Sequence, residues 1–156
     1  MAFDERTHVS EHLAWSELAC HDAARTPYPV NWRASRAKLL AVAFEQVRAL
    51  WGQPLTILSA YRTFAHNRAI GGAQYSQHVQ GRAVDLAPPA GVPIEAFYRQ
   101  IAALVRSGAT PIKGLGRYAR FVHIDTRPAP DLVAWSEATS NGDAERGLAA
   151  LEGSAE

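Results

Sequence analysis

The chain has 156 residues, enough for one domain with its own hydrophobic core. Sixteen Lys and Arg residues are nearly balanced by 15 Asp and Glu residues, which argues against a basic nucleic-acid-binding surface, and we expect no nucleic-acid partner. The single cysteine excludes an intramolecular disulfide and a Cys-rich zinc site. The apolar segments are far shorter than the ~20 residues that cross a bilayer, so we expect no membrane insertion.

The N-terminal stretch MAFDERTHVSEHL is polar and acidic and lacks the basic and apolar regions of a secretory signal peptide. We therefore expect a protein that is cytoplasmic before its release by lysis or another route. A leader trimmed from the N-terminus is the alternative. We expect a monomer.

The first part of the chain is predicted to be mainly helical. A short helix is expected around residues 15–18, and residues 35–51 form the clearest amphipathic pattern, which ends at Gly52 and Pro54. Apolar side chains recur there at helical spacing: Leu40, Phe44, Val47 and Trp51. Residues 55–62 are rich in β-formers and are predicted to be a strand.

Short strands and helices alternate in the second part. We predict helices over residues 63–70 and 93–107 and strands over 82–86, 114–118 and 121–126. There is no regular βαβ rhythm, so the predicted class is α+β, with a small antiparallel sheet flanked by helices. We predict one domain over residues 1–137 and a disordered C-terminal tail, rich in Ala, Ser, Glu and Gly, over residues 138–156.

Three residues of this second part have the chemistry of a metal site. A catalytic zinc commonly takes three protein ligands from His, Asp and Glu, and His78, Asp85 and His123 would provide them from a turn and two strands. Asp85 and His123 interrupt apolar strands, where a polar side chain is costly unless it is paired or bound to a metal. The alternative is a hydrogen-bonded core histidine and a strand-end aspartate, and the H-x6-D spacing alone does not decide between them.

Around these residues the chain carries S-A-Y-R at 59–62, S-x-H-x-x-G-x-A-x-D at 76–85 and F-V-H-I-D at 121–125. These motifs resemble the zinc D-alanyl-D-alanine carboxypeptidase family, which shares its fold and metal site with the Hedgehog domain and with phage endolysins and murein endopeptidases. Ala60 stands where the family usually has Gly. The resemblance covers approximately residues 15–127 and implies a Hedgehog/DD-peptidase-like fold.

By this resemblance, His78, Asp85 and His123 would bind one zinc ion. Arg62 would bind a carboxylate or carbonyl of the peptide substrate and belong to the catalytic set, and Ser76 would support the substrate-binding site. Elementary chemistry agrees, because Gly81 allows a tight turn between two of the ligands and a guanidinium is a planar fork suited to carboxylates.

One position departs from the family pattern. Many members have Asp or Glu three residues before the last histidine ligand as general base, whereas this chain has Arg120, which cannot accept a proton. Asp125 is the nearest acidic residue and shares a strand face with His123. Asp125 is either the general base or a group that orients a ligand imidazole or the substrate. We favour the second role, because a metal alone lowers the pKa of the water it binds to about 7.

The resemblance implies a zinc metallopeptidase that acts on peptidoglycan stem peptides, either as a D-Ala-D-Ala carboxypeptidase or as a murein endopeptidase or endolysin. The absence of a signal peptide favours a phage or prophage lysin. The alternative function is a metal-loaded but catalytically silent module that recognises cell-wall peptides or a protein partner, as Arg120 suggests.

Overall fold

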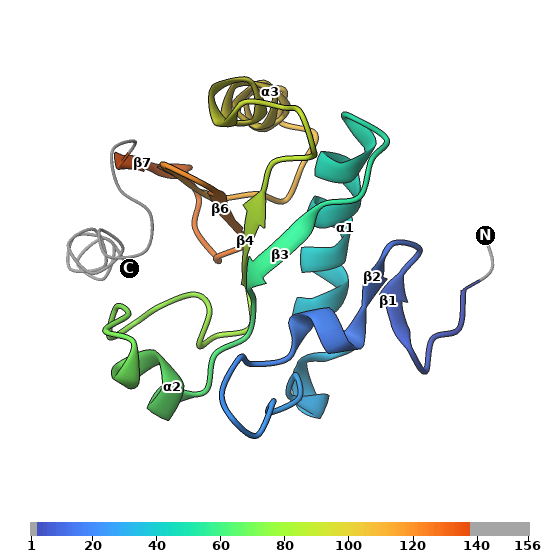
Figure 1. The fold of residues 1–156 in the computed structure, drawn as a ribbon, viewed down its shortest axis with the longest axis vertical. Coiled ribbons are helices and arrows are strands. Elements are labelled where there is room, and N and C mark those ends of the chain that lie inside the picture. The colour runs from blue at the N-terminus through green and yellow to red at the C-terminus, as the bar shows by residue number, and fades with distance from the viewer. Residues whose placement is uncertain (1–2, 138–156) are drawn as a thin grey trace.

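The computed structural model describes residues 3–137, in which three α-helices accompany two β-sheets (Figure 1). This mixture of helices and small sheets confirms the predicted α+β class. The predicted disordered tail, residues 138–156, lies outside the described residues. None of the helices within residues 3–137 has both the length and the apolar character needed to cross a membrane.

The N-terminal segment forms a small hairpin that the sequence did not predict. Strands β1 (His8–Ser10) and β2 (Leu13–Ala14) pair antiparallel. The predicted short helix follows as the 3-10 helix η1 (Trp15–Leu18), and a second 3-10 turn, η2 (Val30–Trp32), precedes the long helix. Glu45 of that helix binds the hairpin, accepting hydrogen bonds from the Ser10 hydroxyl and the His12 backbone N–H.

Helix α1 (Arg36–Ala49) lies between the hairpin and the larger sheet (Figure 1). Its predicted apolar face is buried, with Leu40, Phe44 and Val47 at most 1% exposed. The helix stops two residues before the predicted end. Trp51 lies beyond it and packs against Phe97, with ring centroids 5.1 Å apart.

The larger sheet has five strands in the order β3-β4-β6-β5-β7. Their bounds are Thr56–Ser59 (β3), Ala83–Ala87 (β4), Gly114–Tyr118 (β5), Val122–Asp125 (β6) and Val133–Glu137 (β7). Strands β3, β4, β6 and β5 pair antiparallel in that order. The predicted small antiparallel sheet is present in these four strands, and it is extended by an edge strand, β7, that was not predicted and runs parallel to β5.

One face of this sheet carries apolar core residues, and the other carries the polar residues of the candidate site. Residues that alternate along β4, β5 and β6 point into the core shared with α1 and α3 (Ile94–Arg106): Val84, Leu86, Leu115, Val122 and Ile124. The residues between them, Asp85, His123 and Asp125, therefore point to the opposite face. The short helix α2 (Phe64–Ala69) and the segment that follows it lead into β4 (Figure 1), and this segment carries His78.

Candidate metal centre

A single row of directly paired residues crosses the whole sheet at the candidate site. Asp85 of β4 is the partner of Ser59 on β3 and of His123 on β6. His123 is in turn the partner of Gly116 on β5, and Gly116 is the partner of Trp135 on β7. Since paired residues point to the same side, two of the three predicted ligands are placed together by the register of β4 and β6.

The third predicted ligand, His78, comes from the tight turn before β4. Gly81 has φ +68°, and a Cβ there would lie 2.7 Å from the Trp32 ring and 2.9 Å from the Tyr28 hydroxyl. That hydroxyl donates to the Gly81 carbonyl at 2.6 Å. The predicted need for glycine is therefore confirmed on two grounds, the backbone conformation and the available space. The turn leads the chain into β4, where Asp85 lies seven residues after His78.

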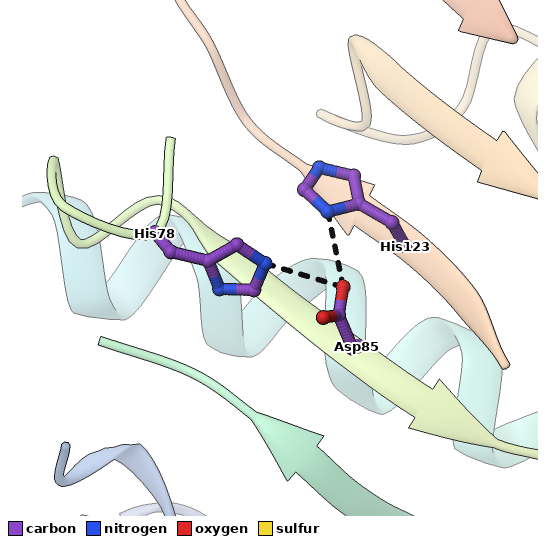
Figure 2. A group of neighbouring side chains, drawn as sticks. All are labelled: His78, Asp85 and His123. Atoms are coloured by element: carbon purple, nitrogen blue, oxygen red, sulfur yellow. Dashed lines mark hydrogen bonds and ion pairs between the residues drawn. The ribbon is translucent and has the colours of Figure 1, made fainter. Parts of the chain in front are cut away.

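The side chains of His78, Asp85 and His123 converge, as Figure 2 shows. Nε2 of His78 lies 3.2 Å from Oδ1 of Asp85, and Nδ1 of His123 lies 3.0 Å from the same oxygen. One ligand atom from each residue lies within 4.8 Å of the other two. All three residues are at most 3% exposed.

The outer nitrogen of each imidazole is held by an acceptor. Nδ1 of His78 lies 2.7 Å from the carbonyl oxygen of Ala60, and Nε2 of His123 lies 2.7 Å from Oδ2 of Asp125. A carbonyl and a carboxylate can only accept, so both outer nitrogens carry the proton. In neutral rings the two inner nitrogens then present lone pairs to the Asp85 oxygen.

Lone pairs directed at a buried carboxylate repel it unless a cation lies among them. Burial lowers the pKa of His123, but the hydrogen bonds that its ring donates to Asp125 and Asp85 outweigh this effect and raise the pKa well above its ordinary value. Burial would also raise the pKa of Asp85, yet the neighbouring His78 and His123 hold this pKa below its usual range. The site therefore requires a positive charge, either a proton or a metal ion.

A metal ion fits this requirement on the chemistry of the donor set. Two imidazole nitrogens and one carboxylate oxygen match the three protein ligands of many catalytic zinc sites. The Ala60 carbonyl and the Asp125 carboxylate hold the outer nitrogens, as acceptors commonly do behind metal-ligating histidines. His78, Asp85 and His123 can therefore hold a metal.

Comparison with known protein families agrees with this geometry. The sequence profile of the peptidase M15 family matches residues 11–125, well over half of the chain. The chain belongs to the peptidase M15 family. A comparison with individually curated proteins finds no significant match. Family membership makes the protein a peptidase. It also supports its assignment as a metallopeptidase, because the peptidases of the M15 family are zinc-dependent.

Asp125 of this M15 peptidase is fully buried and heavily bonded. Besides His123, its oxygens accept from the backbone N–H of Arg127 at 3.1 Å, from Arg127 Nε at 2.9 Å and from Arg127 Nη2 at 2.8 Å. Burial would raise the pKa of Asp125, but the hydrogen bonds from His123 and Arg127 prevail and lower it. Asp125 is therefore a carboxylate between two donors. The sequence did not identify Arg127 as its partner.

Arg62 lies beside the cluster and is 3% exposed. Its Nε donates to Ser59 Oγ at 3.1 Å, its Nη1 donates to Asn67 Oδ1 at 3.2 Å, and its Nη2 lies 3.7 Å from Asp85 Oδ2. Asn67, which no sequence motif indicated, also donates to the Ala73 carbonyl at 2.7 Å. The guanidinium is thus held next to the ligand carboxylate.

The remaining predicted residues lie as follows. Ser76 is buried, and its hydroxyl accepts from the backbone N–H of His78 at 3.1 Å, which stabilises the turn that carries this ligand. Arg120 is exposed, in the connection between β5 and β6. The structure therefore brings His78, Asp85, His123, Asp125 and Arg62 together and leaves the Arg120 side chain toward solvent.

Two glycines and a tryptophan of the site were missed. A Cβ on Gly114 would overlap the Asp125 carboxylate, and a Cβ on Gly116 would overlap the Trp135 ring. The Trp135 ring lies beside His123, with centroids 5.1 Å apart, and its Nε1 donates to the Tyr118 hydroxyl at 2.9 Å. Two glycines at alternate positions in a predicted strand were a usable signal, because they leave one strand face bare for neighbouring side chains.

Proposed function

We propose that this M15 peptidase uses one zinc ion to hydrolyse peptide bonds in peptidoglycan stem peptides, as a D-Ala-D-Ala carboxypeptidase or as a murein endopeptidase of the endolysin type. One observation carries the proposal: His78 Nε2 and His123 Nδ1 converge on one oxygen of Asp85, while their outer nitrogens are held by acceptors. The wall-peptide substrate rests on the resemblance of the S-x-H-x-x-G-x-A-x-D motif at residues 76–85 to the carboxypeptidase family.

Zinc held by these residues would polarise the scissile carbonyl and activate water for its hydrolysis. In our proposal Arg62 binds a carboxylate or carbonyl of the stem peptide. Its position 3.7 Å from Asp85 supports this role, because a substrate group bound there would lie next to the ligand cluster. Ser59 and Asn67 fix the guanidinium, so its donors are oriented before the peptide arrives.

We assign Asp125 to the positioning of His123 rather than to proton transfer. Its low pKa and its hydrogen bonds from Arg127 support this choice, because a strongly stabilised carboxylate is a weak base. By holding the outer nitrogen of His123, Asp125 keeps the inner nitrogen directed at the cluster. The lone pair of a ligand is thereby fixed in place.

The proposed setting is the cell wall. The enzyme would act as a monomer on stem peptides after its release from the cytoplasm, in the manner of a phage or prophage lysin.

The decisive experiment measures metal content and product masses on the same sample. Purified protein should hold close to one equivalent of zinc and should release shortened stem peptides from peptidoglycan, with a loss of activity on chelation and a return on adding zinc. The product masses identify the bond that is cut. His78→Ala should lose metal and activity, whereas His66→Ala, a histidine of α2 outside the cluster, should keep both. Protein without stoichiometric metal would contradict the proposal.

A second candidate function is a metal-loaded module that binds wall peptides or a protein partner without cleaving them. Arg120 at the position usually held by an acid supports it, as does the engagement of Asp125 by two donors. A turnover assay on soluble muropeptides with zinc present separates the two functions. Chelator-sensitive cleavage supports the enzyme, and tight binding without product supports the module.

A further inference from the structure

A cavity of about 680 Å³ opens at one end of the sheet, apart from the metal-binding cluster. It lies where α1 begins, β4 and β5 begin and β6 ends. Its lining includes Arg36 from the first turn of α1, Arg82 from just before β4, Lys113 from just before β5, and Thr126 and Arg127 from just after β6. Neither His78 nor Asp85 nor His123 lines it.

Four cationic side chains lie around this cavity, and one of them, Arg127, is paired with Asp125. The four are those of Arg36, Arg82, Lys113 and Arg127, and no Asp or Glu among residues 3–137 lines the cavity. The protein as a whole has a formal net charge of only +1, so the concentration of cations here is a local feature. Charges of one sign gathered in a concave site raise the local concentration of ions of the opposite sign.

Arg82 is the least compensated of these cations. Within the described part of the chain, its guanidinium has neither a hydrogen bond nor an ion pair, although the side chain is partly buried. Burial, together with repulsion from Arg36, lowers the pKa of Arg82, and attraction to Tyr28 and Asp125 offsets only part of this effect. Arg36 is itself held over the Trp32 ring, at 4.1 Å, and donates to the Gln80 carbonyl at 2.8 Å. The repulsion between Arg36 and Arg82 is a cost that an anion bound in the cavity would offset.

Uncharged donors complete the lining. Thr126 borders the cavity and is 5% exposed, and its hydroxyl is buried without a hydrogen-bond partner among residues 3–137. Ser35, the residue that precedes α1, lines the cavity and makes no side-chain cap to that helix. The first backbone N–H groups of a helix have no partners within it and carry a partial positive charge. Guanidinium forks, a hydroxyl and a helix N-terminus together are the donors that phosphate groups bind.

We propose that this cavity is a binding site for a phosphate group, with Arg82 as its principal ligand. The site goes beyond the peptidase function and does not depend on it. The cavity lies mainly on the α1 side of the sheet, because Arg82 and Thr126 alternate with residues of the metal-bearing face. Arg127 is the link between the two sites, since it lines the cavity and also binds Asp125, which holds His123.

The test titrates inorganic phosphate, and separately glycerol 3-phosphate, into the metal-loaded protein by calorimetry, with sodium acetate at matched ionic strength as reference. Arg82→Gln should weaken phosphate affinity about tenfold or more, as expected for the loss of a charge-assisted hydrogen bond. The matched control is Arg106→Gln, an exposed arginine at the end of α3. Lys113→Gln is a second variant with the same expected direction, should Arg82→Gln fold poorly. Arg127 is left unchanged because it binds Asp125.

Tighter binding of inorganic phosphate than of glycerol 3-phosphate would assign the site to the free anion, and the reverse order would assign it to a phosphate carried on a larger molecule. Either order of affinities supports a phosphate site when Arg82→Gln weakens the binding of these compounds and Arg106→Gln does not. Equal affinity for acetate, or phosphate binding unaffected by both Arg82→Gln and Lys113→Gln, would overturn the proposal. Phosphate bound only at the metal belongs to this second outcome, since neither variant touches the metal ligands.

Discussion

Asp85 and His123 are direct cross-strand partners on β4 and β6, and Nδ1 of His123 lies 3.0 Å from Oδ1 of Asp85. The pairing register alone therefore fixes two-thirds of the ligand set, and only His78 depends on a turn. A register shift of one residue in either strand would send that strand's ligand to the core face. Two of the three ligands are thus held by the sheet itself.

Asp85→Asn tests the charge at the centre of the cluster. The amide keeps the size of the side chain but removes the negative charge on which both histidine nitrogens converge. We expect zinc affinity to fall by more than about 100-fold, since even groups that only orient a ligand contribute about 10–100-fold. Zinc competition titration measures the change. Asp131→Asn, an exposed aspartate before β7, is the control, and unchanged affinity in Asp85→Asn would contradict the assignment of Asp85 as a ligand.

Asp125→Asn distinguishes the two roles of this residue. If Asp125 holds His123, the variant should lose about 10–100-fold in zinc affinity, because an amide can present its NH₂ group to the imidazole and reverse the proton pattern. If Asp125 is the general base, kcat should fall while zinc affinity stays close to that of the wild type. Measuring zinc affinity and kcat on the same preparation separates these outcomes. We expect the affinity to fall.

Much of the site could be predicted from the sequence because its spacing is local. The run from His78 to Asp85 contains a turn residue and a strand, so two ligands and the glycine between them are specified within eight residues. The F-V-H-I-D strand places His123 and Asp125 on one face by the two-residue period. The strand predicted at residues 114–118 is β5, and the helices predicted at 63–70 and 93–107 are α2 and α3 with slightly shorter bounds.

The features that the sequence did not predict depend on contacts between distant segments. Strand β7 follows a proline-rich stretch and is defined by its parallel pairing with β5, a partner that no local pattern indicates. The two strands of the N-terminal hairpin are three and two residues long, too short for a periodic pattern. Arg127 and Asn67 act through hydrogen bonds that only the folded backbone brings into reach.

Gly114→Ala and Gly116→Ala form a matched pair on β5. The new methyl group of Gly114→Ala would meet the Asp125 carboxylate, which is buried and held by His123 and Arg127, so it cannot move without breaking hydrogen bonds. We expect this variant to lose about 1–3 kcal/mol of stability, the usual cost of overpacking, and to bind zinc more weakly. Chemical denaturation and zinc titration measure both effects.

In Gly116→Ala the obstacle is instead the Trp135 ring, on the partly exposed edge strand β7. This ring can turn outward, so we expect Gly116→Ala to lose less stability than Gly114→Ala and to keep a near-normal zinc affinity. Equal effects of the two substitutions would show that the strand tolerates or rejects a methyl group regardless of Asp125, against the role given to Gly114.

Glu45→Gln tests how the N-terminal hairpin is fastened to α1, and its effect should depend on pH. Burial raises the pKa of Glu45, but hydrogen bonds from Ser10 and His12 outweigh it and lower this pKa. A carboxylate with a depressed pKa in the folded state stabilises the fold fully above its unfolded value of about 4.3, and this stabilisation is lost as the pH falls through the folded pKa. We therefore expect Glu45→Gln to be about 1 kcal/mol less stable than the wild type above about pH 5, with this stability gap closing below about pH 4.

Denaturation curves across this pH range measure the stability gap. Glu11→Gln is the control, because Glu11 is exposed and reaches the same His12 only at 3.8 Å. A gap that stays constant down to low pH would mean that the charge of Glu45 is not what holds the hairpin.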